Sequence, residues 1–197
     1  MTQTQVARPP DTLHGTDALD DAGAQDGTDT VDGTRTRTFS WEDPSRAAGS
    51  VGQATGLEML RSMIAGELPP PPIMKTLDFD RIEALGEGRV DVYVTPQEFH
   101  YNPLGTVHGG VISAVLDTAT GCAVHTTLPA GLGYTSLDLN VRFLRPVTIA
   151  SGQLRCEGSV TSRGRQTALG EAHLYDSTGR LVAHATSTCL IFPMPPR

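Results

Sequence analysis

The segment that most constrains the fold of this chain is Asn102–Gly110, because it runs directly into a long apolar stretch. Its first half cannot be helical, since Pro103 biases Asn102 away from the α region of the backbone. Three glycines within its last six residues let the main chain come close to a bound group. The segment therefore predicts a loop that leads into the first turn of a helix.

The residues after this loop have the pattern of a buried helix. Apolar side chains recur at the spacing of one helical face, namely Val111, Val115, Leu116, Ala119, Cys122 and Ala123. Gly109 and Gly110 leave N–H groups open at the positive end of the helix dipole, where an anion or oxyanion can bind. Asp117 is an acid in an otherwise apolar and small-residue stretch, and burying a carboxylate without a partner is costly. Asp117 is therefore the first candidate for a functional side chain.

The first 50 residues differ in composition from the rest. They carry nine acidic residues and four arginines, a net charge of −5 (4 − 9) out of −7 for the 197-residue chain. Low hydrophobicity with net negative charge predicts a disordered acidic tail over residues 1–50. A lead-in segment follows over residues 51–75, with an amphipathic helix over 56–66 and then a stiff proline-rich spacer. Residues 76–197 are expected to form one folded domain.

Composition also excludes several classes of protein. From residue 51 on, eleven basic residues nearly balance thirteen acidic ones, so no nucleic-acid partner is expected. The pattern of a secretory signal is missing, and no apolar stretch reaches the roughly eighteen residues of a membrane span. Cys122, Cys156 and Cys189 lie far apart in apolar patterns, which predicts buried reduced thiols in a cytoplasmic protein. No cysteine or histidine pair has the spacing of a zinc site, so no metal is expected.

The remaining pattern predicts an antiparallel sheet around the helix. The expected strands are residues 76–84, 89–95, 135–143, 152–162, 166–175 and 181–192. The third strand alternates with period two. Its expected faces are Leu137, Leu139, Val141 and Phe143 on one side, and Ser136, Asp138, Asn140 and Arg142 on the other. Two strands, one long helix and four strands predict an α+β fold, in which the sheet wraps its apolar face around the helix.

These motifs resemble those of the PaaI-like (phenylacetate-degradation type) acyl-CoA thioesterases, which have the hotdog fold. The resemblance rests on Asn102 with His108-Gly109-Gly110, on Asp117 nine positions after the histidine, and on the strand Ser136–Pro146. Gly164-Arg165 and Gly179–Thr186 add to it. It covers roughly residues 55–192 and leaves the acidic tail unexplained.

The resemblance implies hydrolysis of an acyl-CoA thioester, with CoA as part of the substrate and no separate cofactor. The N–H of Gly109 would polarise the thioester carbonyl and Asn102 would help to orient it. Asp117 would act as general base or as nucleophile, and Ser136 would hold the water. An oxyanion donor and a carboxylate base are what acyl transfer needs.

Further site residues follow from the same resemblance. Gly110 and the turn Arg163-Gly164-Arg165 are expected to bind the substrate, the two arginines through the phosphates of CoA. His108 either bonds the loop or takes part in the chemistry. A homodimer is expected, and whether dimers pair into a homotetramer stays open.

If Gly109 and Asp117 act in one site, as the resemblance implies, helix geometry also requires a dimer. Eight residues of helix separate Gly109 from Asp117, which is roughly 12 Å of axial rise at about 1.5 Å per residue. The donor and the base must both lie about 3 Å from one reacting centre. Within one chain they cannot, but a two-fold axis that makes the helices antiparallel brings Asp117 of one copy beside Gly109 of the other.

Other interpretations remain open for these residues. Gly109-Gly110 could form only a tight turn, Ser113 or Thr120 could satisfy a buried Asp117, and Ser136 could be an outward strand residue. A hotdog enoyl-CoA hydratase would need an acid and a histidine where this chain has His100 and Gly105, so that function is excluded. A non-catalytic acyl-CoA-binding or sensor protein is the alternative from another class. Asp117 argues against it, because a pure binder needs no buried base.

Overall fold

The computed structural model describes residues 33–195. The chain divides into two units, residues 1–38 and 39–197, and the second contains every element discussed below. The predicted disorder of residues 1–32 lies outside the described residues. The end of the predicted tail instead forms helix α1 at Ser45–Ser50, in which Ala47 is buried. Seven of the nine acids precede residue 33, so averaging over 50 residues placed the predicted boundary too late.

The second unit is an α+β structure, as predicted. Its helices and strands are α2 (Gly56–Ile64), α3 (Pro72–Thr76), β1 (Phe79–Gly86), β2 (Arg89–Val94), α4 (Gly109–Thr126), β3 (Leu132–Ser136), β4 (Asn140–Phe143), β5 (Leu154–Arg163), β6 (Thr167–Tyr175) and β7 (Leu181–Pro193). Two short 3₁₀ turns lie at Glu98–His100 and Ile149–Ser151. Each predicted strand overlaps an observed one, although the first begins at Phe79 and residues 135–143 are divided between β3 and β4, and the predicted central helix begins at Gly109.

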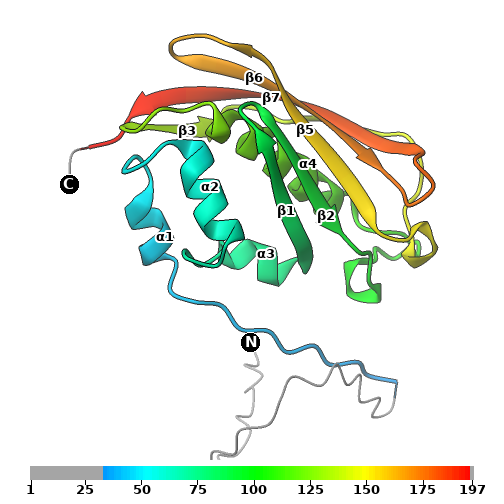
Figure 1. The fold of residues 1–197 in the computed structure, drawn as a ribbon. Coiled ribbons are helices and arrows are strands. Elements are labelled where there is room, and N and C mark those ends of the chain that lie inside the picture. The colour runs from blue at the N-terminus through cyan, green and yellow to red at the C-terminus, as the bar shows by residue number, and fades with distance from the viewer. Residues whose placement is uncertain (1–32, 196–197) are drawn as a thin grey trace, which may run out of the picture. The chain divides into compact units, whose positions relative to one another are not determined.

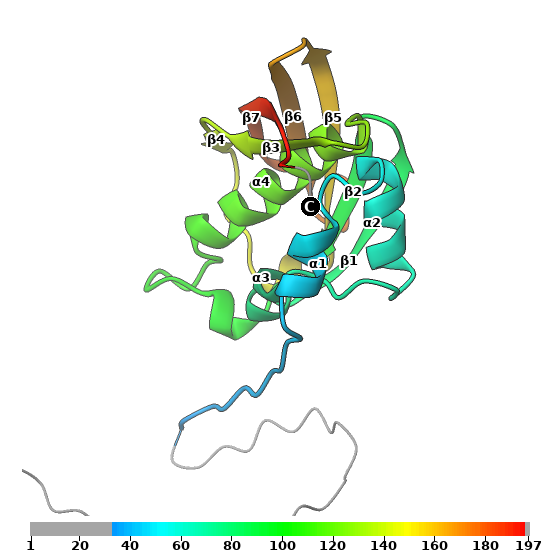
Figure 2. The same cartoon turned by 90° about the vertical axis from the view of Figure 1, so that its left-hand side faces the viewer.

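The seven strands form one antiparallel sheet. Its order is β1-β2-β5-β6-β7-β3, and β4 pairs with β7 beside β3 along the same edge. The sheet curves around α4, which packs against β2, β5, β6 and β7 (Figures 1 and 2). Helix α2 packs against both β1 and α4. The predicted arrangement of a sheet wrapped around one helix is confirmed.

Alternating side chains of β2 build part of the core. Val90, Val92 and Val94 point inward from β2 and are at most 2% exposed, while the residues between them lie on the outer face. Leu116 of α4 is fully buried in the same cluster. Gly158 of β5 lies directly under α4, where an added Cβ would overlap the carbonyl oxygen of Ala119. Glycine at this position therefore allows the helix to lie close on the sheet.

The lead-in segment agrees with the prediction for its helix and differs for its spacer. Thr55 and Glu58 form a capping box, in which each side chain accepts a hydrogen bond from the other residue's main-chain N–H, at 3.2 and 3.0 Å. The predicted extended proline segment ends early. Pro72 begins α3, because proline suits the first position of a helix, where its missing N–H is not needed.

The buried face of α4 differs from the predicted one. Ile112 and Val124 are buried, whereas Val111 and Cys122 are only half-buried. The cause is that the residues packed around α4 form two apolar clusters rather than one, with Val124 in the second. A single stripe on a helical wheel cannot represent contacts on two sides.

The predicted strand 135–143 is divided into β3 and β4. Ser136 pairs with Cys189 and Asn140 pairs with Thr186, so three residues of this edge lie opposite two residues of β7. This is a β-bulge, which contains one extra residue. The predicted single alternation across 135–143 is therefore wrong, because the bulge reverses which face each later side chain occupies.

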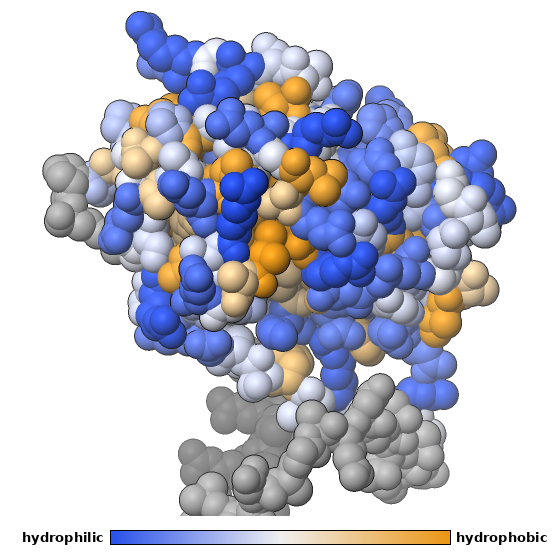
Figure 3. All heavy atoms as spheres, in the orientation of Figure 1, coloured by the Kyte–Doolittle hydropathy of each residue, from blue (hydrophilic) through white to orange (hydrophobic). Residues whose placement is uncertain are grey.

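The surface of the second unit is predominantly polar on the side seen in Figure 1. Figure 3 shows hydrophilic residues over most of this side, with smaller apolar areas between them. Among residues 33–195, no helix combines the length and the hydropathy needed to span a membrane. The site described next lies where the loop before α4 meets the β3–β4 edge of the sheet.

Candidate active site

The first turn of α4 leaves one main-chain donor open. The side chain of His108 caps the helix, because its Nδ1 accepts a hydrogen bond from the N–H of Gly110 at 2.8 Å. The N–H of Val111 donates to the carbonyl oxygen of His108 at 3.0 Å. Within the described part of the chain, the N–H of Gly109 has no recorded acceptor. It lies at the positive end of an 18-residue helix, where a developing negative charge is stabilised.

The loop before α4 is held by the side chain of Asn102. Its Oδ1 accepts from the N–H groups of Leu104 and Thr106 at 2.8 and 3.3 Å, and its Nδ2 donates to Oγ1 of Thr106 at 3.0 Å. The oxygen of Asn102 is therefore used within the loop, and one of its two amide hydrogens is left. The structure brings Asn102 near Gly109, and its observed contacts are those of a loop-forming residue.

A hollow of about 400 Å³ opens at this end of the helix. Its wall is formed by Asn102, Thr106, Val107, Gly109, Ile112, Phe143, Leu144, Arg145, Pro146 and Val147. Phe143 of β4 covers Gly109, and a Cβ added to this glycine would lie 3.2 Å from Cζ of the ring. The hollow thus combines an open main-chain donor with an apolar wall.

Asp117 and Ser136 form a second polar feature. The hydroxyl of Ser136 donates to Oδ1 of Asp117 at 3.2 Å, from β3 to the middle of α4. Asp117 is half-buried. Neither Ser113 nor Thr120 bonds its carboxylate, because their hydroxyls donate to the main-chain oxygens of Gly109 and Asp117.

The groups around Asp117 are neutral. Burial raises the pKa of Tyr134, and Cys122, Cys189 and Asp117 add to this rise. Burial raises the pKa of the Cys122 thiol to about 12, with a further contribution from Asp117. A thiol with so high a pKa is not a nucleophile at neutral pH. Cys122 is therefore not a second nucleophile beside Asp117.

The two features do not meet within one chain. The hollow includes Asn102 and Gly109, whereas Asp117 and Ser136 are not part of its wall. This agrees with the axial separation of roughly 12 Å along α4 that follows from about 1.5 Å per residue. Each copy of the chain thus presents the two candidate features at different places.

The turn Arg163-Gly164-Arg165 lies elsewhere, between β5 and β6. The N–H of Gly164 donates to the carbonyl oxygen of Thr167 at 2.8 Å, which closes the turn, and both arginines are exposed. They contribute nothing to the hollow of the same chain. Their contact with CoA stays a prediction.

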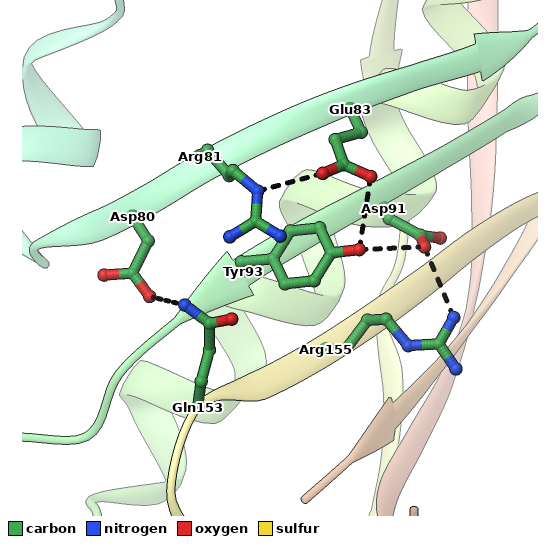
Figure 4. A network of polar contacts seen from close by, with 7 residues as sticks. All are labelled: Asp80, Arg81, Glu83, Asp91, Tyr93, Gln153 and Arg155. Atoms are coloured by element: carbon green, nitrogen blue, oxygen red, sulfur yellow. Dashed lines mark hydrogen bonds and ion pairs between the residues drawn. The ribbon is translucent and has the colours of Figure 1, made fainter. Parts of the chain in front are cut away.

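Another cluster of titratable side chains lies on the outer face of the sheet (Figure 4). Asp91 is 6% exposed, 3.4 Å from Arg155 and 3.4 Å from the hydroxyl of Tyr93, which also contacts Glu83. Burial raises the pKa of Asp91, and Arg155 opposes this. Asp91 is paired with Arg155 and Arg81 with Glu83 at 2.9 Å, while Asp80 accepts a hydrogen bond from Gln153 at 2.8 Å. Paired charges of this kind are typical of a structural cluster.

Sequence reasoning missed Phe143 as part of the site. In the sequence, Phe143 is only one apolar residue of an alternating strand, and its place over Gly109 depends on the bulge.

Among the described residues, no three His, Cys, Asp or Glu side chains lie close enough to hold a metal ion.

Comparison with known proteins identifies the family. The model of the thioesterase superfamily matches residues 104–183. A phenylacetic acid degradation-related protein from Ralstonia eutropha JMP134 is 34% identical, with a TM-score of 0.61, over 66% of this chain and 98% of that one. The chain belongs to the thioesterase superfamily. Its sheet and central helix are the hotdog fold, as the sequence predicts.

Other relatives agree with this assignment. A thioesterase family protein from Silicibacter pomeroyi is 26% identical, with a TM-score of 0.60, over 68% of this chain and 96% of that one. Acyl-coenzyme A thioesterase 13 of Mus musculus is 28% identical over 47% of this chain. A Halobacterium salinarum protein with a provisional esterase name is 39% identical over 34% of this chain. The matches span 65% and 44% of these last two proteins.

Proposed function

We propose that this protein hydrolyses an acyl-CoA thioester to the free acid and CoA, as a homodimer with sites shared between its subunits. The observation that carries the proposal is the Asp117–Ser136 pair on the same helix whose first N–H, that of Gly109, is open. Membership of the thioesterase superfamily supports the reaction class. The name of the mouse relative supports CoA as the thiol.

The hollow supplies the electrophilic half of the reaction. The thioester carbonyl would lie with its oxygen toward the N–H of Gly109, and the helix dipole would stabilise the negative charge that develops there. The acyl group would lie against the apolar wall formed by Ile112, Phe143 and Val147. No charged side chain is needed in this half.

Asp117 of the other subunit supplies the base. Its carboxylate would take a proton from a water held by Ser136, while the water oxygen bonds to the carbonyl carbon. The resulting tetrahedral oxyanion collapses, the C–S bond breaks, and CoA leaves as a thiolate that takes up a proton. If Asp117 acts as nucleophile instead, its oxygen bonds to the carbonyl carbon, the C–S bond breaks, CoA leaves as a thiolate, and water then hydrolyses the resulting anhydride. Attack of that water on the Asp117 carbon would label the protein in a single turnover in H₂¹⁸O.

The β3–β4 edge supports the dimer. Leu137, Phe143 and Leu144 are 58%, 54% and 47% exposed along this edge of the sheet. Large apolar side chains on an edge strand are what an interface with a second copy would bury. We expect a dimer in sedimentation experiments, which would also show whether dimers pair into a tetramer. Arg163 and Arg165 lie in the turn between β5 and β6 rather than on this edge, so a dimer formed through the edge would leave them accessible to CoA phosphates.

The experiment that tests this function is a panel of acyl-CoA thioesters assayed by release of free thiol. Turnover of at least one member by the wild type, and its loss in Asp117→Asn, are the expected results. Tight binding of acyl-CoA without turnover would favour the alternative, a non-catalytic acyl-CoA sensor. The panel would also identify the acyl group.

A further inference from the structure

The bulge between β3 and β4 is an ordered feature. Ser136 still pairs with Cys189, and the next regular pair is Asn140 with Thr186. Three edge residues therefore lie opposite two residues of β7. A bulge leaves main-chain groups without their usual ladder partners, and each such group needs another partner when it is buried.

Asp138 lies at the centre of the bulge, and its oxygens accept hydrogen bonds from donors of the bulge and of β7. Its Oδ1 accepts from the N–H of Thr188 at 3.0 Å and from Nδ2 of Asn140 at 3.3 Å. Its main-chain oxygen accepts from the hydroxyl of Ser187 at 2.8 Å, and Ser187 is fully buried. The N–H of Leu137 donates to the oxygen of Thr188 at 2.8 Å. Two side chains thus replace the missing ladder bonds.

The extra residue decides where Ser136 points. In a regular strand, Ser136 and Val141 are an odd number of positions apart and occupy opposite faces. In this protein both lie on the face toward α4: Val141 packs against the core, and Ser136 donates to Asp117. Phe143 shares this face and covers Gly109. Without the bulge, Val141, Phe143 and Ser136 could not all face the helix.

We propose that Asp138 and Ser187 are positioning residues that hold Ser136 against Asp117. They act through the register of the edge and lie outside the wall of the hollow. This role rests on the proposed function, in which Ser136 orients the attacking water. A carboxylate on the outer edge of a strand thereby controls the geometry of a base on the helix.

The register can be measured without any enzyme assay. Ser136 and Cys189 are opposite each other, and such cross-strand pairs have Cβ atoms about 4.5–5.5 Å apart, close to the span of a disulfide. We expect Ser136→Cys to form a disulfide with Cys189 on mild oxidation, detected by peptide mapping. Adding Asp138→Ala should reduce its yield several-fold. Adding Asp138→Asn should not, because the amide oxygen still accepts from Thr188. Equal yields in all three proteins would overturn the role of Asp138 in the register.

Kinetics test whether the register matters for the reaction. Asp138→Ala should lower kcat by about 10- to 100-fold, the range expected for a small misplacement of a reacting group, with little change in KM. Asp138→Asn should stay within about threefold of the wild type, and Ser187→Ala should fall between the two. In the Ser136→Ala background, Asp138→Ala should cause no further loss. A loss that adds in full to that of Ser136→Ala would overturn the proposal, since Asp138 would then act by another route.

Asp176 provides the matched control. Its carboxylate accepts from the N–H groups of Thr178 and Arg180 in the β6–β7 turn, at 2.9 and 3.0 Å, and the residue lines no part of the hollow. Asp176→Ala should lower the melting temperature and leave kcat unchanged. A wild type that hydrolyses no thioester would overturn the proposed function. The crosslink would still show whether Asp138 sets the register.

Discussion

The two parts of the candidate site on α4 use different kinds of chemical group, one from the main chain and one from a side chain. The hollow at the start of the helix offers a main-chain N–H, and it depends on a loop and a cap to keep that group open. The middle of the helix offers the carboxylate of Asp117, which depends on Ser136 from a neighbouring strand. The first part can be removed only by changing the backbone, whereas the second is lost with one side chain. This difference determines how each part can be tested.

The largest effect is expected at Asp117. Asp117→Asn is nearly isosteric and keeps an acceptor for Ser136, but it removes the base, which typically contributes 10²–10⁴-fold to the rate. We expect kcat to fall by about that factor at an unchanged melting temperature. Folded Asp117→Asn with wild-type turnover would show that the carboxylate has no chemical role.

The main-chain donor needs a different substitution. Gly109→Pro removes the N–H and adds the proline ring, and the site suits proline, because it is the first helical position and His108 has the extended ψ of 135° that precedes proline. Loss of one oxyanion donor costs about 10²–10³-fold in kcat. Gly109→Ala is the control, since it places the same Cβ near Phe143 but keeps the N–H. Equal losses in both variants would point to crowding by Cβ and would contradict the donor role.

Mixed dimers test whether the two parts come from different subunits. Gly109→Pro and Asp117→Asn should each be nearly inactive alone. When equal amounts are refolded together, about half of the dimers are mixed by random pairing, and each mixed dimer has one intact site. Thiol release should therefore recover to about a quarter of the wild-type rate. Subunit exchange without recovery would place both parts of the site in one chain.

A smaller effect is expected at the helix cap. His108→Ala removes the acceptor for the N–H of Gly110, and loss of an N-cap costs about 1 kcal/mol of unfolding free energy. His108→Asn should restore most of it, because asparagine is a good cap. Both measurements are made by urea denaturation. A rate loss as large as that of Asp117→Asn, in folded His108→Ala, would assign the imidazole a chemical role.

The smallest effect is expected outside both parts of the site. Deleting residues 1–38 should leave the melting temperature and the turnover nearly unchanged, because their composition cannot bury enough apolar surface to offset the entropy of ordering them. Deleting residues 1–50 also removes α1 with its buried Ala47, and it should lower the melting temperature. If the shorter deletion destabilised the protein as much as the longer one, residues 1–38 would have a structural role.

Much of this architecture could be predicted from the sequence. Gly109, the start of α4 and the order of the strands follow from local signals such as glycine, proline and alternation. The features that sequence reasoning missed depend on contacts between distant segments. The bulge is one of them, because residues 135–143 alternate regularly in the sequence, and only pairing with β7 shows that one residue is extra. Phe143 reaches Gly109 only as a result of that pairing.

The roles of Asn102 and Gly110 show a similar limit. The family resemblance predicts that both contact the substrate, but the structure places the oxygen of Asn102 in the loop and the N–H of Gly110 on His108. Polar groups near a helix start have many local partners, and the sequence does not tell which partner each one takes. Asp117 is a simpler prediction, since a single acid within an apolar helix has few explanations.

The main-chain donor at Gly109 also affects how this protein can evolve. Every amino acid except proline carries an N–H, so drift at this position rarely removes the proposed oxyanion donor. If Asp117 is the base, a single change there would abolish turnover and leave the hollow in place. A duplicated copy of the gene would then be one substitution away from encoding a receptor for the same ligand, and one reversion away from the enzyme.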